Sequence, residues 1–336
     1  MSKKIVLTGI TTTGTPHIGN YVGAIRPAID ASRNPDALSF YFLADYHALV
    51  KCHEPDILRQ STLEVAATWL ALGLDIDTCI FYRQTDIPEI PELTWILTCM
   101  AAKGLMNRAH AYKAAAQENE TIKTKDPDKG INMGLFCYPI LMAADILMFK
   151  ASQVPVGKDQ IQHLEMARDI AARFNHIYGA TFVLPEAVTD AKTAILQGLD
   201  GRKMSKSYNN TIPLFLPEKK LRKLIMKIKT NSQPPEEPKD PDTCTLFQIF
   251  QAFAEPDETL TLRQRYAQGI AWGEMKQYLF EYLNDHLKDP RAQYAELIEH
   301  PGHIESLLQE GARKAREYSK PFLNQIRRAI GIAPLG

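Results

Sequence analysis

Apolar residues follow two different periods along the first two hundred positions. Short apolar runs bounded by polar or turn-forming residues predict buried strands, and four occur, at residues 4–8, 38–44, 79–83 and 152–156. Between them, apolar residues recur every three or four positions, as on one buried face of a helix. These predicted helices span residues 17–29, 56–73, 91–105, 138–150 and 159–178. The alternation predicts an α/β fold with a doubly wound parallel sheet, which binds ligands at the carboxyl ends of its strands.

The pattern changes after about residue 210, where predicted strands stop. Helical periods fill the rest of the chain, at residues 217–230, 244–254, 259–268, 273–288 and 291–326. We therefore expect a Rossmann-like domain over residues 1–210 and a C-terminal all-helical domain over residues 211–336, whose last helix packs back on the first domain. Residues 117–134 are polar and fit neither period, which indicates a mobile loop near the site or a surface insertion.

Composition narrows the class of protein. The 336 residues include 39 Lys plus Arg and 39 Asp plus Glu, so the formal net charge is zero, which argues against coating nucleic acid by bulk positive charge. No apolar run reaches 18 residues, and Ile5–Leu7 is too short for a signal-peptide core, so we expect a cytoplasmic protein without membrane contact. The five cysteines form no CxxC pair, which predicts reduced core thiols and no metal site.

The segment Gly14–Asn20 lies where the first predicted strand passes into the first predicted helix. Such a junction directs free backbone N–H groups and the positive end of the helix toward a ligand, which suits phosphate. His17 and Asn20 are three positions apart and share a helix face, and Gly19 leaves room for a flat group beside the backbone. A tight turn without a ligand would show the same pattern.

A second segment, Gly201–Tyr208, carries Lys203 and Lys206 on either side of Ser205. Flexible lysine side chains can follow a polyphosphate whose charge shifts during a reaction. A solvated basic loop is the alternative interpretation.

Together the two segments resemble the two signature sequences of class I aminoacyl-tRNA synthetases. Lys203–Ser207 matches the second signature in full, and His17–Asn20 matches the first except that its last position is asparagine rather than histidine. They occur in the family's order, about 185 residues apart. The resemblance implies ATP as a substrate, with Mg²⁺ carried on it. The catalytic residues that it implies are His17, Asn20, Lys203, Ser205 and Lys206.

Further segments are similar to the bacterial, tryptophan-specific branch of this family, and the similarity covers nearly the whole chain. They are Thr8–Ile10, Gly19–Ala24, Asp45–Ala48, Tyr138–Leu147 and Val154–Gln160. The resemblance implies activation of L-tryptophan by ATP to tryptophanyl-adenylate plus pyrophosphate, followed by transfer to the terminal adenosine of tRNA(Trp). It also implies a homodimer.

Asp145 is a lone carboxylate in an otherwise apolar predicted helix. Burying an unpaired charge is costly, so this side chain needs a partner. A partner within the protein is one interpretation. The resemblance implies another, in which the carboxylate accepts the indole N–H of tryptophan. A site built to pair a substrate N–H rejects analogues that lack it.

The resemblance assigns the other binding residues as well. The tryptophan site would comprise Gly9, His47, Tyr138, Met142, Asp145, Val154, Val156 and Gln160. Met142 and the two valines would pack on the indole, with ordinary core as the alternative for each valine. Tyr138 and Gln160 would hold the amino group, and His47 would lie near the amino acid, with a buried, satisfied histidine as the alternative. The ATP site would comprise Thr11, Thr12, Thr13, Gly19, Asn20, Gly157, Lys158, Asp159, Lys203, Met204, Ser205, Lys206 and Ser207. The sequence departs from the family at Thr11–Thr13, where relatives often carry Gln-Pro-Ser, although these hydroxyls could still reach phosphate.

Charge is unevenly distributed along the chain. Residues 202–230 hold nine basic residues and one acidic residue, a net charge of +8. Lysine and arginine contacts to phosphates supply much of the affinity for RNA, so this stretch is a candidate tRNA contact, with a solvated helix face as the alternative. Arg265, Tyr266 and Trp272 are candidates for reading single-stranded bases by stacking and edge hydrogen bonds.

Three other functions remain open from the sequence. A tyrosine-specific synthetase shares the fold and both signatures, although Met142 and Asp145 favour tryptophan. A small-molecule nucleotidyltransferase uses a similar phosphate-binding turn but needs no helical domain. A non-catalytic RNA-binding relative would not need the intact Lys203–Ser207 signature.

Overall fold

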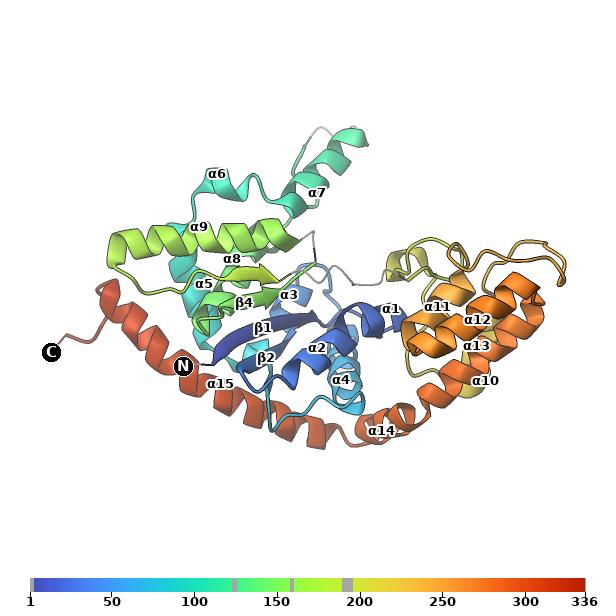
Figure 1. Cartoon of the computed structure of the whole chain (residues 1–336). Helices are drawn as coiled ribbons and strands as arrows, with labels where there is room; N and C mark the ends of the chain where they lie inside the picture. Colours follow the sequence, from blue (N-terminus) through green and yellow to red (C-terminus); the bar gives the residue numbers. More distant parts are fainter. Residues whose placement is uncertain (1–2, 123–125, 158–159, 189–195, 336) are drawn as a thin grey trace.

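The centre of the molecule is a parallel sheet of five strands, seen in the computed structural model, which describes residues 3–122, 126–157, 160–188 and 196–335 (Figure 1). The strands are β1 (Lys4–Thr11), β2 (Ala37–Ala44), β3 (Ile80–Arg83), β4 (Gln153–Pro155) and β5 (Glu186–Val188). Their order is β3-β2-β1-β4-β5. Strands β2 and β3 are added on one side of β1 and strands β4 and β5 on the other, so the strand order reverses between β1 and β4. The doubly wound parallel fold and the four predicted strands are confirmed. The strand β5 was not predicted, because it has three residues and all are exposed.

Helices on both faces connect these strands. They are α1 (Ile18–Asn20), α2 (Arg26–Ser32), α3 (Asp45–Ala48), α4 (Pro55–Ala71), α5 (Glu89–Met100), α6 (Lys103–Met106), α7 (His110–Thr121), α8 (Met133–Met148) and α9 (Ile161–Tyr178). The predicted helix over 17–29 is confirmed, with a π-helical turn at Tyr21–Ile25 between α1 and α2. The helix predicted from residue 138 begins earlier, at Met133, because the Asn132 side chain caps it by accepting the Leu135 N–H at 2.8 Å.

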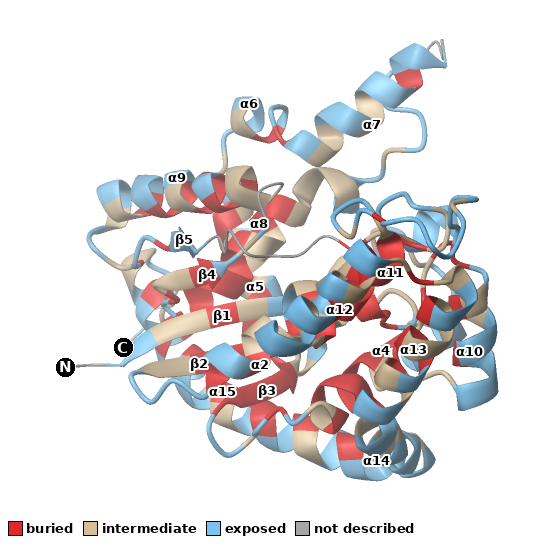
Figure 2. Ribbon diagram, turned by 45° about the vertical axis from the view of Figure 1, so that its right-hand side comes forward, coloured by how far each residue is buried: buried red, intermediate tan, exposed pale blue. Residues whose placement is uncertain are grey.

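The prediction of a loop over residues 117–134 was wrong at both ends. Helix α7 continues to Thr121, and α8 already begins at Met133. Figure 1 shows α7 projecting away from the sheet, and its surface is largely exposed in Figure 2. A helix that buries almost nothing has no apolar stripe, so periodicity could not reveal it.

Side chains along β2 point alternately to the two faces of the sheet, and an apolar core lies on each face. Phe40 and Phe42 belong to one apolar cluster, with residues of α5, α8 and α9. Tyr41 and Leu43 point to the opposite face and pack with residues of α4, including Trp69. A strand buried on both sides reads as a continuous apolar run, which is why the sequence revealed it.

The C-terminal part is helical, as predicted. Its helices are α10 (Glu218–Met226), α11 (Thr245–Phe253), α12 (Pro256–Gln268), α13 (Trp272–His286), α14 (Lys288–Glu299) and α15 (Pro301–Ala329). Helices α10 to α13 share an apolar cluster that also takes in Ile18, Leu196 and Met204. The single helix predicted over 291–326 is two helices, because His300 leaves helical geometry (φ −122°, ψ 62°) and Pro301 starts the next one. No helix in the described ranges is long and apolar enough to cross a membrane.

Helix α15 covers the edge of the sheet. Its first turns contribute Ile304 and Leu308 to the core on one face, and its later turns contribute Phe322 and Leu323 to the core on the other. Figure 1 shows it running the length of the sheet. Because β3 is an edge strand, this helix covers backbone groups that would otherwise be free to pair with another chain.

Gly311 lies at the closest approach of α15 to β3. A Cβ at this position would lie 1.7 Å from the backbone carbonyl oxygen of Phe81, which cannot move without distorting the strand. Only glycine allows the helix to touch the strand backbone here.

We expect Gly311→Ala to lower the free energy of unfolding by at least about 2 kcal/mol, because overpacking against backbone forces the helix away from the strand. Gly302→Ala, on the same helix, is the matched control, since a Cβ there would have no described atom within 4 Å. Its effect should stay within about 1 kcal/mol. Urea unfolding followed by circular dichroism measures both. Equal stability of the two variants would contradict the close packing.

Candidate active site

A cavity of about 680 Å³ opens at the carboxyl ends of β1 and β4. This is the point where the strand order reverses, which is where open α/β sheets bind ligands. The eight residues assigned to the tryptophan site all line it: Gly9, His47, Tyr138, Met142, Asp145, Val154, Val156 and Gln160. Three residues assigned to the ATP site line it as well: Thr11, Thr13 and Gly157.

Gly9 is needed at the floor of this cavity. A Cβ there would lie 2.6 Å from Cζ of Phe42 on the neighbouring strand β2. Any larger residue would displace this ring, which itself lines the cavity.

Asp145 reaches the cavity from α8 and is only 2% exposed. Its Oδ2 lies 2.8 Å from Nε2 of His47. The side-chain N–H₂ of Gln84 donates to both carboxylate oxygens, at 2.7 and 2.9 Å. Burial raises the pKa of Asp145, and the hydrogen bonds from His47 and Gln84 oppose that rise. The partner within the protein that the sequence left open therefore exists, and it is a pair of side chains.

Gln84 was missed by the sequence analysis. It is completely buried and follows β3 directly, at the carboxyl end of the strand, and its Oε1 also accepts the backbone N–H of Tyr46 at 3.2 Å. A polar residue at the carboxyl end of a buried strand is the signal that could have found it.

The other side of the cavity holds a chain of polar side chains. Tyr138 Oη lies 2.8 Å from Nε2 of His163, and Nδ1 of the same ring lies 3.0 Å from Oε1 of Gln160. Because an amide oxygen only accepts, Nδ1 carries the proton, and the Nε2 of a neutral ring then accepts from the tyrosine hydroxyl. His163 is 2% exposed and thus fixes the orientation of both cavity residues.

His17 and Asn20 pair with each other at the start of α1. Nδ1 of His17 accepts the backbone N–H of Asn20 at 3.3 Å, and Oδ1 of Asn20 accepts the backbone N–H of His17 at 3.1 Å. Burial, together with the positive charge of Lys206, lowers the pKa of His17 to about 4. The ring is therefore neutral at pH 7 with its proton on Nε2, which makes Nε2 a hydrogen-bond donor.

The two signature segments meet in space. The Lys206 ammonium donates to the carbonyl oxygen of Thr13, in the loop before α1. A Cβ at Gly19 would lie 3.5 Å from the sulfur of Met204 and 3.0 Å from Nδ1 of His17. Partial desolvation of the ammonium lowers the pKa of Lys206.

Asn210 holds the second segment in shape, and the sequence analysis did not single it out. Its Oδ1 accepts the Ser205 N–H at 2.8 Å, and its Nδ2 donates to Asp200 at 2.7 Å and to the Lys203 carbonyl at 3.1 Å. It is 2% exposed, so the loop that carries both lysines is built around a buried amide.

Some expected residues lie elsewhere. Thr12, assigned to the ATP site, is completely buried, its hydroxyl has no hydrogen-bond partner among the described residues, and it is not among the residues that line the cavity. Lys158 and Asp159 lie outside the described residues. Tyr266 is also completely buried, so it cannot stack on an RNA base. Among the cysteines, Cys79 is buried as predicted but Cys99 is exposed.

Comparison with known proteins agrees with this geometry. The model of the family "tRNA synthetases class I (W and Y)" matches residues 2–288. The tryptophan–tRNA ligase of Neisseria meningitidis serogroup A is 59% identical over 335 residues and covers 100% of both chains. The chain belongs to the tryptophan–tRNA ligase family.

Two further members of the tryptophan–tRNA ligase family are also similar to this chain. The ligase of Pseudomonas syringae pv. tomato is 59% identical over 97% of this chain and 73% of its own length. The crystal structure of tryptophanyl-tRNA synthetase from Campylobacter jejuni, complexed with ADP and tryptophan, is 43% identical and has a TM-score of 0.88, with 97% of this chain and 99% of that chain covered. The class I synthetase family predicted from the sequence is thereby confirmed, which excludes the small-molecule nucleotidyltransferase.

The low pKa of His17 predicts a pH dependence of stability. In the unfolded chain this group titrates near its ordinary value of 6.5, so below that pH the unfolded state binds a proton that the folded state refuses. The stability that neutral His17 gives the folded state is fully present above pH 6.5. It is lost as the pH falls toward about 4, which lowers the free energy of unfolding by on the order of 2 kcal/mol.

The matched variant is His17→Asn, which keeps a good capping residue at the helix start but does not titrate. Urea unfolding at pH 7.0, 5.5 and 4.5 should show a steeper loss of stability in the wild type than in the variant. Parallel pH profiles would contradict the low pKa.

Proposed function

We propose that this chain ligates L-tryptophan to tRNA(Trp) with its own residues in the roles set out below. The tryptophan carboxylate attacks the α-phosphorus of ATP in line, and pyrophosphate leaves. A hydroxyl of the terminal adenosine of tRNA then attacks the acyl carbon, and AMP leaves. The first nucleophile is already an anion at pH 7, so the first step needs no general base and depends on positioning and charge stabilisation.

The observation that carries this proposal is the environment of Asp145. A carboxylate that is 2% exposed lines the cavity, which Met142 and Val154 also line. Its two oxygens can accept about four hydrogen bonds, and among the residues that the structure describes His47 and Gln84 supply three. One acceptor direction is left for the indole N–H of tryptophan. Phenylalanine has no such donor, and tyrosine carries its hydroxyl on a smaller ring.

The remaining residues of the cavity would hold the rest of the amino acid. Met142, Val154 and Val156 would pack on the indole ring. Tyr138 and Gln160, both oriented by His163, would hold the α-amino group. This arrangement leaves the carboxylate of tryptophan directed toward the β1–α1 loop.

ATP would enter as its Mg²⁺ complex along that loop. The backbone at Thr11, Thr13, Gly19 and Asn20 would cradle the phosphates, and neutral His17 would donate from Nε2 without adding a charge. Lys206 would leave the Thr13 carbonyl and follow the departing pyrophosphate, with Lys203 and Ser205 beside it. The resemblance adds Gly157, Lys158, Asp159, Met204 and Ser207 to this site.

The RNA would bind along the basic stretch into the helical part. On α10, Leu221 and Ile225 are buried, whereas Lys219, Lys220 and Lys223 are exposed, so one face is free to meet phosphates. We assign residues 211–336 to anticodon recognition and residues 1–210 to catalysis, with α15 packed on the sheet. Of the candidate base readers, Arg265 and Trp272 remain.

Two further assignments complete the proposal. We expect the enzyme to act in the cytoplasm, where tRNA is charged. We expect a homodimer, and Trp95 on α5, which is 69% exposed, supports a surface that self-association would cover.

The test of the substrate is ATP–pyrophosphate exchange screened across the twenty amino acids. Tryptophan should support exchange and tyrosine and phenylalanine should not. In Asp145→Ala, kcat/KM for tryptophan should fall by roughly 10- to 150-fold, the value of a hydrogen bond to a charged group.

Asp145→Asn serves as the variant that preserves size, and circular dichroism shows whether each variant is folded. A folded Asp145→Ala protein with unchanged kcat/KM for tryptophan would rule out the proposed role. Exchange supported by tyrosine in the wild type would rule out tryptophan as the substrate.

Lys206→Ala should slow adenylate formation by about 10²-fold or more, because it removes a charge that stabilises the phosphates in the transition state. Single-turnover formation of tryptophanyl-adenylate measures this step directly. Lys320→Ala, an exposed lysine of α15, is the control and should keep the wild-type rate. A near-wild-type rate in Lys206→Ala would overturn the assignment.

A further inference from the structure

The turn after β3 connects the tryptophan pocket to another part of the molecule. Arg83 ends β3, and Gln84–Asp86 form one 3₁₀ turn, η2. The Gln84 side chain reaches Asp145 in the first cavity. Its neighbours Arg83 and Thr85 line a second cavity, of about 670 Å³, between α4 and the start of α15. Neighbouring side chains at this turn therefore point to two different cavities: Gln84 to the first, and Arg83 and Thr85 to the second.

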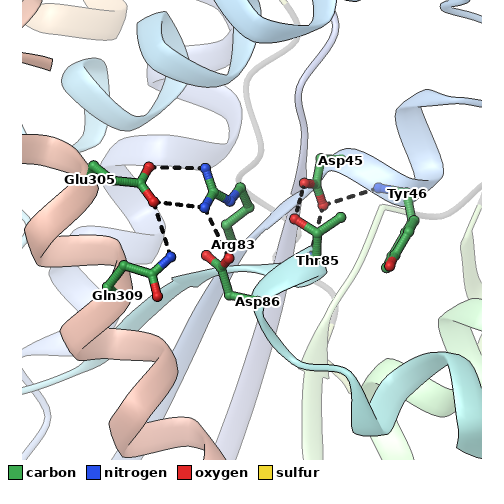
Figure 3. A network of polar contacts seen from close by, with 7 residues as sticks. All are labelled: Asp45, Tyr46, Arg83, Thr85, Asp86, Glu305 and Gln309. Atoms are coloured by element: carbon green, nitrogen blue, oxygen red, sulfur yellow. Dashed lines mark hydrogen bonds and ion pairs between the residues drawn. The ribbon is translucent and has the colours of Figure 1, made fainter. Parts of the chain in front are cut away.

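Arg83 is clamped by the C-terminal helix (Figure 3). Its Nη1 donates to Oε2 of Glu305 at 3.0 Å and its Nη2 donates to Oε1 at 2.9 Å. The same Nη2 donates to Oδ1 of Asp86 at 2.9 Å, and Gln309 supports Glu305 by donating to Oε1 at 3.0 Å. A guanidinium held by two parallel bonds is fixed in orientation as well as in distance.

The preceding strand is tied to the same turn. Asp45, which directly follows β2 and begins α3, accepts the Thr85 hydroxyl at 2.6 Å and the Thr85 N–H at 3.2 Å (Figure 3). Asp45 also accepts the backbone N–H of Tyr46 at 3.1 Å, and Oε1 of Gln84 accepts the same N–H. His47, the second partner of Asp145, follows directly. Both partners of the carboxylate thus sit on turns that this network holds.

We propose that Arg83, clamped by Glu305 of α15, is a positioning residue for tryptophan recognition. It touches no substrate. It fixes the turn that aims the Gln84 amide at Asp145, and so sets which direction of the carboxylate stays open for the indole N–H. The inference rests on the function proposed above and deepens it.

Glu305→Ala tests the clamp with little risk to the fold, because this side chain is 49% exposed. We expect KM for tryptophan in the exchange reaction to rise by roughly 3- to 30-fold, the usual span for residues that act through others. The KM for ATP and kcat should change less than about twofold, because an interaction that contributes equally to binding substrate and transition state affects KM alone.

Glu310→Ala is the matched control. Glu310 lies on the same helix with 48% exposure, and in the described part of the chain its ion pair is with Arg313 of that helix. It should leave all three kinetic constants at wild-type values. An equal rise of the tryptophan KM in both variants, or unchanged constants in Glu305→Ala, would overturn the proposal. Glu305→Gln keeps one acceptor and should give an intermediate KM.

A double-mutant cycle with Gln84→Met shows whether the effect passes through Gln84. If it does, the double variant has the same tryptophan KM as Gln84→Met alone. Multiplying effects would instead indicate independent action and overturn the inference.

Failure of the proposed function looks different, since the wild type would then show no tryptophan-dependent exchange at all. Thermal unfolding of each variant completes the test: a loss of kcat for every substrate in step with a lower Tm would reveal a merely structural role.

Discussion

A carboxylate buried among apolar side chains must be hydrogen-bonded, and the architecture around Asp145 meets that requirement. Leaving such a charge unpaired would cost several kcal/mol. Helix α8 carries it into the core, and the turns after β2 and β3 bring His47 and Gln84 to it. Because β2 and β3 are parallel neighbours, their carboxyl ends meet at one edge of the sheet. The sheet thus places both partners side by side, where α8 presents the carboxylate to them.

The phosphate end of the site follows a different rule. In the segments to which we assign ATP, the polar groups satisfy one another: His17 pairs with Asn20, and Lys206 donates to the carbonyl of Thr13. One is a neutral donor held in the first helical turn and the other is a mobile charge on a long stem. In the proposed reaction, a fixed neutral donor would orient the ground state, whereas a charge that can move would follow the shift of negative charge toward pyrophosphate.

Strands and helices could be predicted from the sequence where their burial requires a regular pattern of apolar residues. Strand β2 is buried on both faces and shows as a continuous apolar run, and α9 carries a regular apolar stripe. Helix α7 and strand β5 bury too little to leave one. The assigned tryptophan residues converge on one cavity, whereas Gln84 and Asn210 escaped notice because neither belongs to a motif that was matched. Gln84 acts through Asp145, which is distant in sequence, whereas Asn210 acts within its own loop, on Asp200, Lys203 and Ser205.

Helix α15 shows why the end of the chain matters to a site built near its beginning. At Gly311 it touches the backbone of β3, and at Glu305 it binds the last residue of that strand. An edge strand without this cover would be free to shift or to pair elsewhere. Any shift of β3 along its axis moves Arg83 and Gln84 together, and with them the amide that orients Asp145. The position of the Gln84 amide and the docking of the final helix therefore depend on one constraint, applied at the edge of the sheet rather than at Asp145 itself.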